Sequence, residues 1–148
     1  MIAIGSDHGG FELKSEIIKH LEERGLQVKD MGTCDCSSVD YPDYGQAVAE
    51  EVSSGKCEKG IIICGTGIGI SIAANKVAGI RAALCTDGYM ARMAKEHNNA
   101  NIIAMGARVV GAGLAIDIVD AWLDAEFQGG RHAQRVAKIT AIEQKYFK

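Results

Sequence analysis

The chain has 148 residues, 47% of them hydrophobic and 24% charged, a composition typical of a globular domain with its own core. Its net charge of −3 gives no electrostatic reason to expect binding to nucleic acid or to an anionic membrane. No apolar run approaches the roughly 20 residues that span a bilayer, and the first residues do not resemble a signal peptide. Five scattered cysteines favour a reducing compartment. We therefore expect one cytoplasmic domain over residues 1–148.

Strand-like apolar runs alternate with helical patterns from the first residue onward. Residues 1–6 predict a buried strand, residues 11–25 a helix, and residues 26–31 a second strand. A loop containing Pro42 leads to a predicted helix over residues 43–55. The later elements are a strand at 59–64, a helix near 69–77, a strand at 79–85, a helix at 87–98, a strand at 100–106, and helices at 111–127 and 131–147.

This alternation predicts an α/β fold with a parallel sheet that helices cover on both faces. The run KGIIIC at 59–64 has no polar alternation, which indicates a strand buried on both sides. Parallel sheets of this kind bind ligands outside the carboxyl ends of their strands. Those ends carry the segments SDHGG, CGTGIG, CTDG and MGAR, where we expect the functional residues.

Three glycines follow the third predicted strand in the stretch KGIIICGTGIGIS. Gly65 and Gly67 match the first two glycines of a dinucleotide-binding turn, but Gly69 comes one residue too early for the third. The Walker pattern is missing as well, because no G-K-[ST] follows. The spacing favours an anion cradle, in which backbone N–H groups and a helix N-terminus face one point. Such a cradle could hold a phosphate or an oxyanion that develops during a reaction.

Cys64 stands between the predicted strand and the glycine loop. A helix N-terminus stabilises a thiolate, which would make Cys64 a base or nucleophile beside a site for negative charge. The alternative is a buried structural cysteine, which is common at strand ends. Cys34 and Cys36 form the only close cysteine pair, and they lack the second ligand pair of a structural zinc site. We therefore predict no metal.

Several cationic side chains could bind a phosphate. Arg131 and Arg135 lie four residues apart, so they share one face of the last predicted helix. The alternative for this pair is a solvated basic face. Arg108 follows the fifth strand and is expected at the ligand-binding edge of the sheet.

Two further segments carry groups that suit a sugar phosphate. Asp7 and His8 follow the first strand, where they could bind hydroxyls or phosphate, although Asp7 could equally cap a helix. His97 ends a predicted helix. It could move protons at neutral pH, or it could interact with the last helix carbonyls.

The segments SDHGG, CGTGIG, HNNAN, MGARV and RHxxR occur here in the order found in type B ribose-5-phosphate isomerases. Over essentially its whole length the sequence resembles this family, and it is similar to galactose-6-phosphate isomerase subunits. The resemblance implies a single-domain, Rossmann-like three-layer sandwich with a five-stranded parallel sheet and a C-terminal helix. It also implies interconversion of D-ribose 5-phosphate and D-ribulose 5-phosphate through an enediolate, without metal or cofactor. Some members of the family also accept allose 6-phosphate.

The resemblance implies roles for individual residues. Cys64 would be the base that moves a proton between C1 and C2, the glycine loop would hold the enediolate with its N–H groups, and Thr66 would assist. His97 would act as a general acid that opens the furanose ring. Contacts to substrate are implied for Asp7, His8, Gly65, Gly67, Ile68, Gly69, Asn98, Arg108, Arg131 and Arg135.

Part of the family carries a glutamate base near position 70, where this chain has Ile70, so the chain resembles the cysteine subgroup. The resemblance also implies a homodimer, possibly a dimer of dimers. In that dimer His97, Asn98 and Arg108 would reach a site whose Cys64 belongs to the partner chain. Two other functions stay open: a nicotinamide- or flavin-binding oxidoreductase, and a non-enzymatic phosphosugar sensor that would not need Cys64 or His97.

Overall fold

The structure is a computed structural model that describes residues 1–147, so Lys148, the last residue of the predicted domain, lies outside the described residues. Its strands are β1 (Ile2–Ser6), β2 (Val28–Asp30), β3 (Lys59–Cys64), β4 (Ala82–Leu84) and β5 (Ile102–Gly106). A short 3-10 helix, η1 (His8–Gly10), precedes the α-helices. These are α1 (Phe11–Glu23), α2 (Tyr41–Ser53), α3 (Ile68–Ala74), α4 (Gly88–Glu96), α5 (Ala112–Asp124) and α6 (Arg131–Tyr146).

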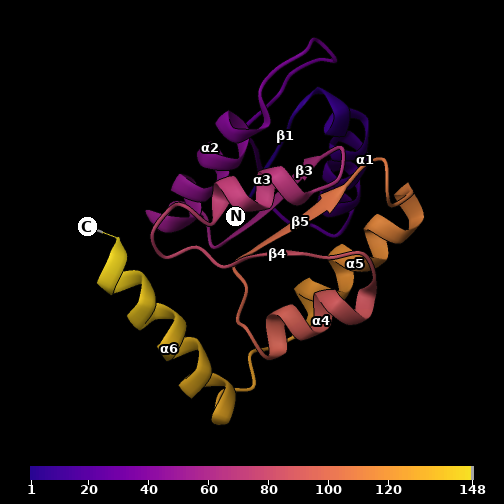
Figure 1. The fold of residues 1–148 in the computed structure, drawn as a ribbon. Coiled ribbons are helices and arrows are strands. Elements are labelled where there is room, and N and C mark those ends of the chain that lie inside the picture. Colours follow the sequence, from indigo (N-terminus) through magenta and orange to yellow (C-terminus); the bar gives the residue numbers. More distant parts are fainter. Residues whose placement is uncertain (148) are drawn as a thin grey trace.

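The strands form one parallel sheet in the order β2-β1-β3-β5-β4 (Figure 1). The predicted α/β fold with a five-stranded parallel sheet and a C-terminal helix is therefore confirmed. From β1 the chain moves outward to β2 and then crosses back to β3 on the other side of β1. The carboxyl ends of β1 and β3 thus flank the point where the strand order reverses, which is where such sheets bind ligands.

Helices cover both faces of the sheet because alternate strand residues point to opposite sides. Ile61 and Ile63 of β3 pack with α1, α4 and α5 around the fully buried Trp122. Ile62 and Cys64 point to the other face, where they pack with α2 and α3. The alternation along β3 therefore directs the Cys64 side chain toward the glycine loop and α3.

Helix α6 lies apart from these layers and extends away from the sheet (Figure 1). His132 is its only buried residue in the part of the chain that the structure describes. Its apolar side chains remain open to solvent, with Ile139 exposed by 46% and Ile142 by 61%. An amphipathic helix that buries so little in one chain leaves an apolar stripe without a partner.

The predicted bounds differ from the observed ones mainly at the edges of the sheet. The predicted strands at 26–31 and 79–85 shrink to β2 and β4, the two edge strands, which pair on one side only. Pro42, predicted to lie in a loop, stands in the first turn of α2, where its missing N–H costs nothing. The 3-10 helix η1 was not predicted.

Candidate active site

Two groups of the predicted residues lie in two different places in one chain. The first, which we call the thiol half-site, comprises Asp7, His8, Cys64–Gly69 and Arg108 at the carboxyl edge of the sheet. The second, the histidine half-site, comprises His97, Asn98, Arg131 and Arg135 where α4 ends and α6 begins.

Cys64 is the last residue of β3, and its side chain is 95% buried, with 5% exposed. Its Sγ accepts a hydrogen bond from the backbone N–H of Gly67 at 3.1 Å. A donor directed at the sulfur stabilises negative charge there. Burial fits a purely structural cysteine, whereas a donor aimed at the sulfur also fits a thiolate, so both interpretations of Cys64 agree with this geometry.

The glycine loop packs tightly against the end of β5. Gly67 has a φ of 81°, and a Cβ there would stand 2.6 Å from the Leu84 side chain. A Cβ on Gly106 would stand 2.6 Å from the backbone of Thr66. Glycine at these two positions therefore allows the loop to curl beneath the sheet edge and bring its N–H groups toward Cys64.

The N–H groups of the loop divide into engaged and open ones. The Gly67 N–H binds Cys64 Sγ, and the Ile68 N–H donates to Thr66 Oγ1 at 3.2 Å. Within residues 1–147 no hydrogen bond engages the N–H groups of Gly69 and Ile70. They belong to the first turn of α3, whose N–H groups have no acceptor inside the helix. These two N–H groups can therefore donate hydrogen bonds to a bound anion.

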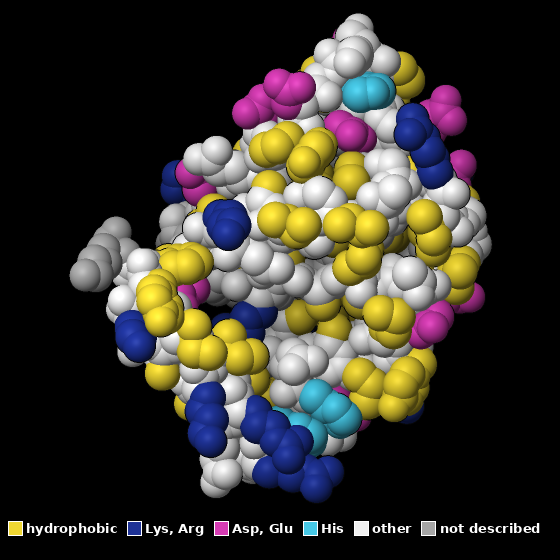
Figure 2. All heavy atoms as spheres, in the orientation of Figure 1, with side chains coloured by type: hydrophobic (Ala, Val, Ile, Leu, Met, Phe, Trp, Pro, Cys, Tyr) yellow, Lys and Arg dark blue, Asp and Glu magenta, His cyan; other side chains and the backbone are white. Residues whose placement is uncertain are grey.

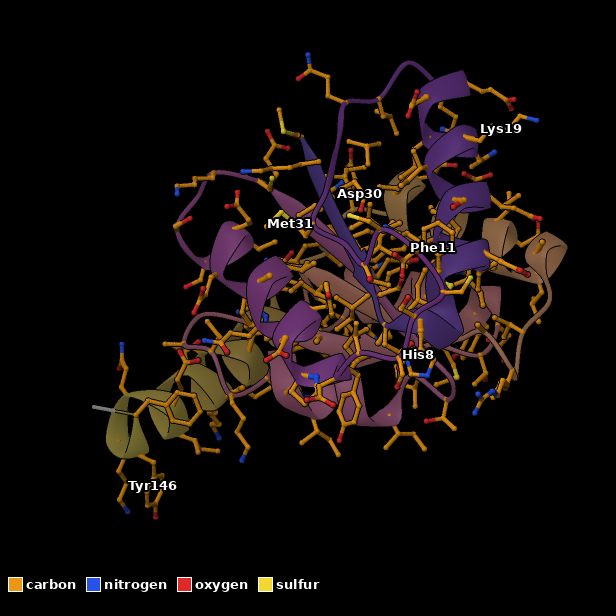
Figure 3. All side chains as sticks on the ribbon, turned by 90° about the horizontal axis from the view of Figure 1, so that it is seen from above. His8, Phe11, Lys19, Asp30, Met31 and Tyr146 are labelled. Atoms are coloured by element: carbon orange, nitrogen blue, oxygen red, sulfur yellow. The ribbon has the colours of Figure 1, made fainter. Side chains whose placement is uncertain are left out.

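Asp7 and His8 follow β1 and lie next to the end of β3, because the Asp7 N–H donates to the Ile63 carbonyl at 3.2 Å. The Asp7 carboxylate is buried and caps η1, with Oδ1 accepting from the Gly10 N–H at 3.1 Å. His8 Nδ1 accepts a hydrogen bond from the Val39 N–H at 3.1 Å. The proton of neutral His8 therefore sits on Nε2, which can donate to a ligand. Figure 3 shows His8 at the start of α1.

Arg108 lies beside the glycine loop of its own chain. Its N–H donates to the Gly65 carbonyl at 3.0 Å, and a Cβ on Gly65 would stand 3.3 Å from its guanidinium. This corrects the expectation that Arg108 reaches the partner's site together with His97 and Asn98. The reason is its position just after β5, whose carboxyl end lies next to that of β3.

The histidine half-site is built on two stacked imidazoles. The rings of His97 and His132 lie 4.1 Å apart between centroids and are nearly parallel, at 8°. His97 caps the end of α4, and His132 lies in the first turn of α6 between Arg131 and Arg135. Figure 2 shows Lys and Arg side chains gathered beside histidines at this end of the molecule. The half-site therefore combines a proton-transfer group with a concentration of positive charge.

Burial lowers the pKa of His132 below its usual value, and the positive charges of His97 and two neighbouring arginines lower it further. The unfolded chain then binds more protons than the folded one below about pH 6.5. We expect the free energy of unfolding to fall as the pH drops from about 6.5 toward the lowered pKa. Urea unfolding at pH 7.5 and 5.5 would measure this loss, which should be smaller in His132→Phe. An equal loss in both proteins would contradict it.

Within one chain the two half-sites lie at opposite ends of the strands, the thiol half-site at the carboxyl ends and the histidine half-site at the amino ends. Cys64 pairs with Gly106 at the carboxyl end, whereas Gly60 binds the Asn101 carbonyl at the other end. Four residues of extended strand separate Gly60 from Cys64, which corresponds to about 13 Å. Asn98 and His97 lie before Asn101, beyond the start of β5. One chain therefore cannot bring His97 and Cys64 to the same small ligand.

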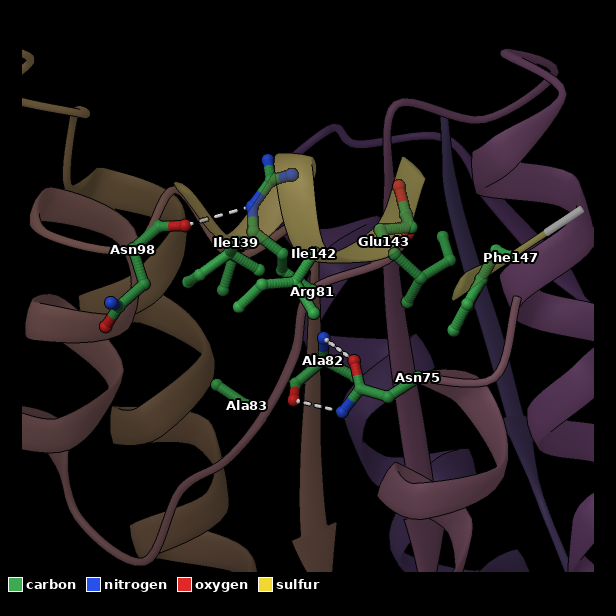
Figure 4. Close-up of a pocket in the computed structure, with 11 residues that line it drawn as sticks. Asn75, Arg81, Ala82, Ala83, Asn98, Ile139, Ile142, Glu143 and Phe147 are labelled. Atoms are coloured by element: carbon green, nitrogen blue, oxygen red, sulfur yellow. Dashed lines mark hydrogen bonds between the residues drawn. The ribbon is translucent and has the colours of Figure 1, made fainter. Parts of the chain in front are cut away.

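A groove of about 420 Å³ runs between α6 and the edge strand β4. Ile80, Ala82, Ala83, Ile139, Ile142 and Phe147 supply much of its apolar lining (Figure 4). The Asn75 side chain binds both the N–H and the carbonyl of Ala82, so it occupies backbone groups that an edge strand would otherwise expose. Asn98 of the histidine half-site also lines this groove.

Sequence reasoning missed three residues around the half-sites. His132 was part of the quoted RHxxR segment, but its stacking on His97 depends on a tertiary contact. Lys14 is fully buried and binds Asp30 Oδ1 and the Thr33 carbonyl, at the base of the loop that delivers Val39 to His8. A lysine on the apolar face of α1, beside Leu13 and Ile17, was the available signal for Lys14. The hydrogen bond from the Val39 N–H to His8 had no signal in the sequence that could have predicted it.

The match to known proteins spans nearly the whole chain. Residues 2–139 match the family described as Ribose/Galactose Isomerase. The chain belongs to this family. Ribose-5-phosphate isomerase B of Escherichia coli (strain K12) is 57% identical to it over 144 residues, which are 97% of each chain. The predicted resemblance is confirmed, and the chain is an isomerase of the ribose/galactose isomerase family.

A solved structure and a differently named relative are also similar to this chain. The structure of Clostridium thermocellum ribose-5-phosphate isomerase B matches with a TM-score of 0.97 and 68% identity, covering 98% of both chains. A relative from Pectobacterium atrosepticum is named D-erythrulose-4-phosphate isomerase, and it is 48% identical over 143 residues, 96% of this chain and 94% of the relative. Relatives of this chain are therefore named for different sugar phosphates. In residues 1–147 no helix is long and apolar enough to cross a membrane.

Proposed function

We propose that the chain interconverts D-ribose 5-phosphate and D-ribulose 5-phosphate, at sites that two copies of the chain complete together. The observation that carries this proposal is the thiol of Cys64, which accepts the Gly67 N–H at the head of a loop whose next N–H groups are open. The high identity to two ribose-5-phosphate isomerases B favours the five-carbon substrate.

Cys64 is the base in this mechanism. Its thiolate removes the proton from C2 of the open-chain aldose and becomes a thiol, while the electron pair of the C–H bond forms the enediolate. The same proton returns to C1 while the proton of the O2 hydroxyl passes to O1, which produces the ketose and regenerates the thiolate. No electrons leave the sugar, so the reaction needs no cofactor. A base held at the reacting carbon accelerates such a transfer by about 10² to 10⁴-fold.

The glycine loop stabilises the charge that this transfer creates. The enediolate carries negative charge on oxygen, and the open N–H groups of Gly69 and Ile70 are oriented donors that need no reorganisation. Thr66 supports the loop, because its Oγ1 holds the Ile68 N–H. Asp7 and His8 lie beside the loop at the end of β1, where they bind the sugar hydroxyls.

The histidine half-site of the second copy supplies the remaining groups. Ribose 5-phosphate is mostly a closed furanose, so the ring must open before C2 can lose its proton. His97 donates a proton to the ring oxygen as the C1–O4 bond breaks, while the O1 hydroxyl gives its proton to a water molecule. Asn98 binds the sugar beside it. Arg131 and Arg135, with Arg108 of the thiol half-site, hold the phosphate, whose binding energy orients the reacting carbons.

A second copy is needed because the two half-sites of one chain lie at opposite ends of the strands. The exposed stripe of α6 and the groove beside β4 offer an apolar surface for that copy. A two-fold dimer then contains two equivalent sites, each with Cys64 from one chain and His97 from the other. Two such dimers could associate further into a dimer of dimers.

Incubation with three sugars tests the proposed function. Ketose formation is measured with ribose 5-phosphate, allose 6-phosphate and erythrose 4-phosphate at equal concentrations. We expect ribose 5-phosphate to give the highest kcat/KM, and allose 6-phosphate to give a lower one. A higher kcat/KM for either other sugar would reassign the substrate, and no ketose from any of them would contradict isomerase activity on these phosphates.

Replacing Arg135 by alanine tests the phosphate site. We expect KM for ribose 5-phosphate to rise by at least about tenfold, with a smaller loss of kcat, because a charged hydrogen bond contributes about 1.5–3 kcal/mol. Steady-state kinetics of Arg135→Ala would be compared with Lys145→Ala, which removes a cation from the last turn of the same helix. An unchanged KM in Arg135→Ala would show that Arg135 belongs to a solvated basic face and does not bind the phosphate.

A further inference from the structure

The side chain of Arg81 binds the turn that follows α4. Its Nε donates to the carbonyl oxygens of Asn98 at 3.0 Å and Asn99 at 3.2 Å, and its Nη2 donates to that of Asn99 at 2.9 Å. Figure 4 shows this guanidinium reaching from the start of β4 toward Asn98. The cation therefore meets carbonyl oxygens at the negative end of a helix, where it is favoured.

The turn has an unusual backbone that this contact helps to hold. Asn99 has a φ of 47°, and among residues 1–147 no other non-glycine residue has a positive φ. Asparagine tolerates this left-handed conformation better than most residues. Lys95 Nζ donates to the Asn99 side chain at 3.0 Å, and the Asn101 side chain accepts from the Arg81 N–H at 2.9 Å. Arg81 thus contacts the turn through both its side chain and its backbone.

We infer that Arg81 is a positioning residue for the isomerase reaction, because it fixes the turn that presents His97 to the substrate. This inference rests on the proposed function, in which His97 opens the furanose ring. Stacking on His132 holds one face of the His97 ring, and Arg81 fixes the peptide that begins one residue later. Loss of Arg81 leaves the imidazole chemically intact but displaced, and a displacement of about 1 Å can cost roughly 100-fold in rate.

Arginine is required at this position for its geometry as well as its charge. The planar guanidinium offers donors in a fixed fork, which matches two neighbouring carbonyl oxygens. A lysine keeps the charge but presents one compact ammonium on a flexible stem. Arg81→Lys therefore removes the fork and retains the electrostatic support of the helix end, so it separates positioning from simple capping.

Steady-state kinetics on ribose 5-phosphate provides the first measurement. We expect Arg81→Lys to lower kcat about tenfold. The matched control is Arg92→Lys, an exposed arginine on α4 whose partner is Glu96, and its kcat should stay within about twofold of wild type. A kcat for Arg81→Lys as close to wild type as the control would overturn the inference.

A double-mutant cycle distinguishes positioning of His97 from a general structural role. It compares the effect of Arg81→Lys on kcat in the wild-type and His97→Gln backgrounds. If Arg81 acts through His97, Arg81→Lys should change kcat by less than about twofold in a His97→Gln background. The same tenfold loss in both backgrounds would show that Arg81 acts elsewhere. Native mass spectrometry is run on every variant, and a loss of dimer confined to Arg81→Lys would assign its effect to assembly and also overturn the inference.

The cycle separates this inference from the proposed function. A His97→Gln variant with nearly wild-type kcat would remove the proposed role of His97, and this inference with it. A His97→Gln variant with low kcat, combined with an additive effect of Arg81→Lys, would remove only the inference about Arg81.

Discussion

Replacing Cys64 by serine is expected to lower kcat for ribose 5-phosphate by about 10³-fold or more, while KM stays within a few-fold. The reason is that a serine hydroxyl does not ionise at neutral pH, so the variant lacks the base that removes the C2 proton. The phosphate contacts in the proposed site do not involve Cys64. Substrate binding should therefore survive, and steady-state kinetics with a direct binding measurement would separate the two effects.

Cys85→Ser is the matched control for this variant. Cys85 is another buried thiol, directly after β4, and burial together with the charge of Asp87 raises its pKa to about 11. It therefore stays protonated at neutral pH and cannot serve as a base. We expect Cys85→Ser to keep kcat within a few-fold of wild type. Activity of Cys64→Ser within a few-fold of wild type would leave Cys64 as a structural residue.

Replacing Ile142 by aspartate should abolish most activity by breaking the dimer. Ile142 is 61% exposed in one chain and faces the groove beside β4, so in the proposed dimer an aspartate would bury an unpaired charge. Each monomer would then hold two incomplete sites. We expect at least a roughly 100-fold loss of activity, because placement of catalytic groups in one site contributes several kcal/mol. Native mass spectrometry and kinetics at equal protein concentration would be compared.

The control for this variant is Leu114→Asp, which places the same charge on an exposed apolar residue of α5 outside the groove. It should remain dimeric and active. A monomeric Ile142→Asp that keeps wild-type kcat would show that one chain suffices, which would contradict the shared site.

The thiol half-site could be predicted from the sequence because its residues follow strands that pattern alone identifies. The run KGIIIC matches β3 residue for residue, which placed Cys64 at the carboxyl end of a buried strand. The pairing of β3 with β5, which brings Arg108 to the glycine loop, was not predicted. The edge strands were predicted too long. Met31 and Cys85, just beyond β2 and β4, each donate one N–H to the neighbouring strand at 2.8 and 3.0 Å, but they lie outside the strands. Pro42 was misplaced because proline is compatible both with loops and with a first helical turn.

The histidine half-site was harder to derive from residues alone. His97 and Arg131 lie more than 30 positions apart in the sequence, and no spacing rule joins the end of α4 to the start of α6. The stacking of His132 and the hydrogen bonds of Arg81 depend on how the chain turns after each helix. Only the family resemblance brought His97, Asn98 and the arginines together, and roles in substrate binding remain predictions.

A heterodimer made from two inactive variants tests the shared site most directly. Cys64→Ala and His97→Ala are co-expressed with two different affinity tags, and the mixed dimer is purified through both tags in turn. One of its sites combines both lesions, and the other combines the intact Cys64 of one chain with the intact His97 of its partner. The shared site predicts about half of the wild-type activity per dimer, although each parent homodimer is inactive. A mixed dimer, confirmed by its mass, that remains as inactive as its parents would contradict a site built from two chains.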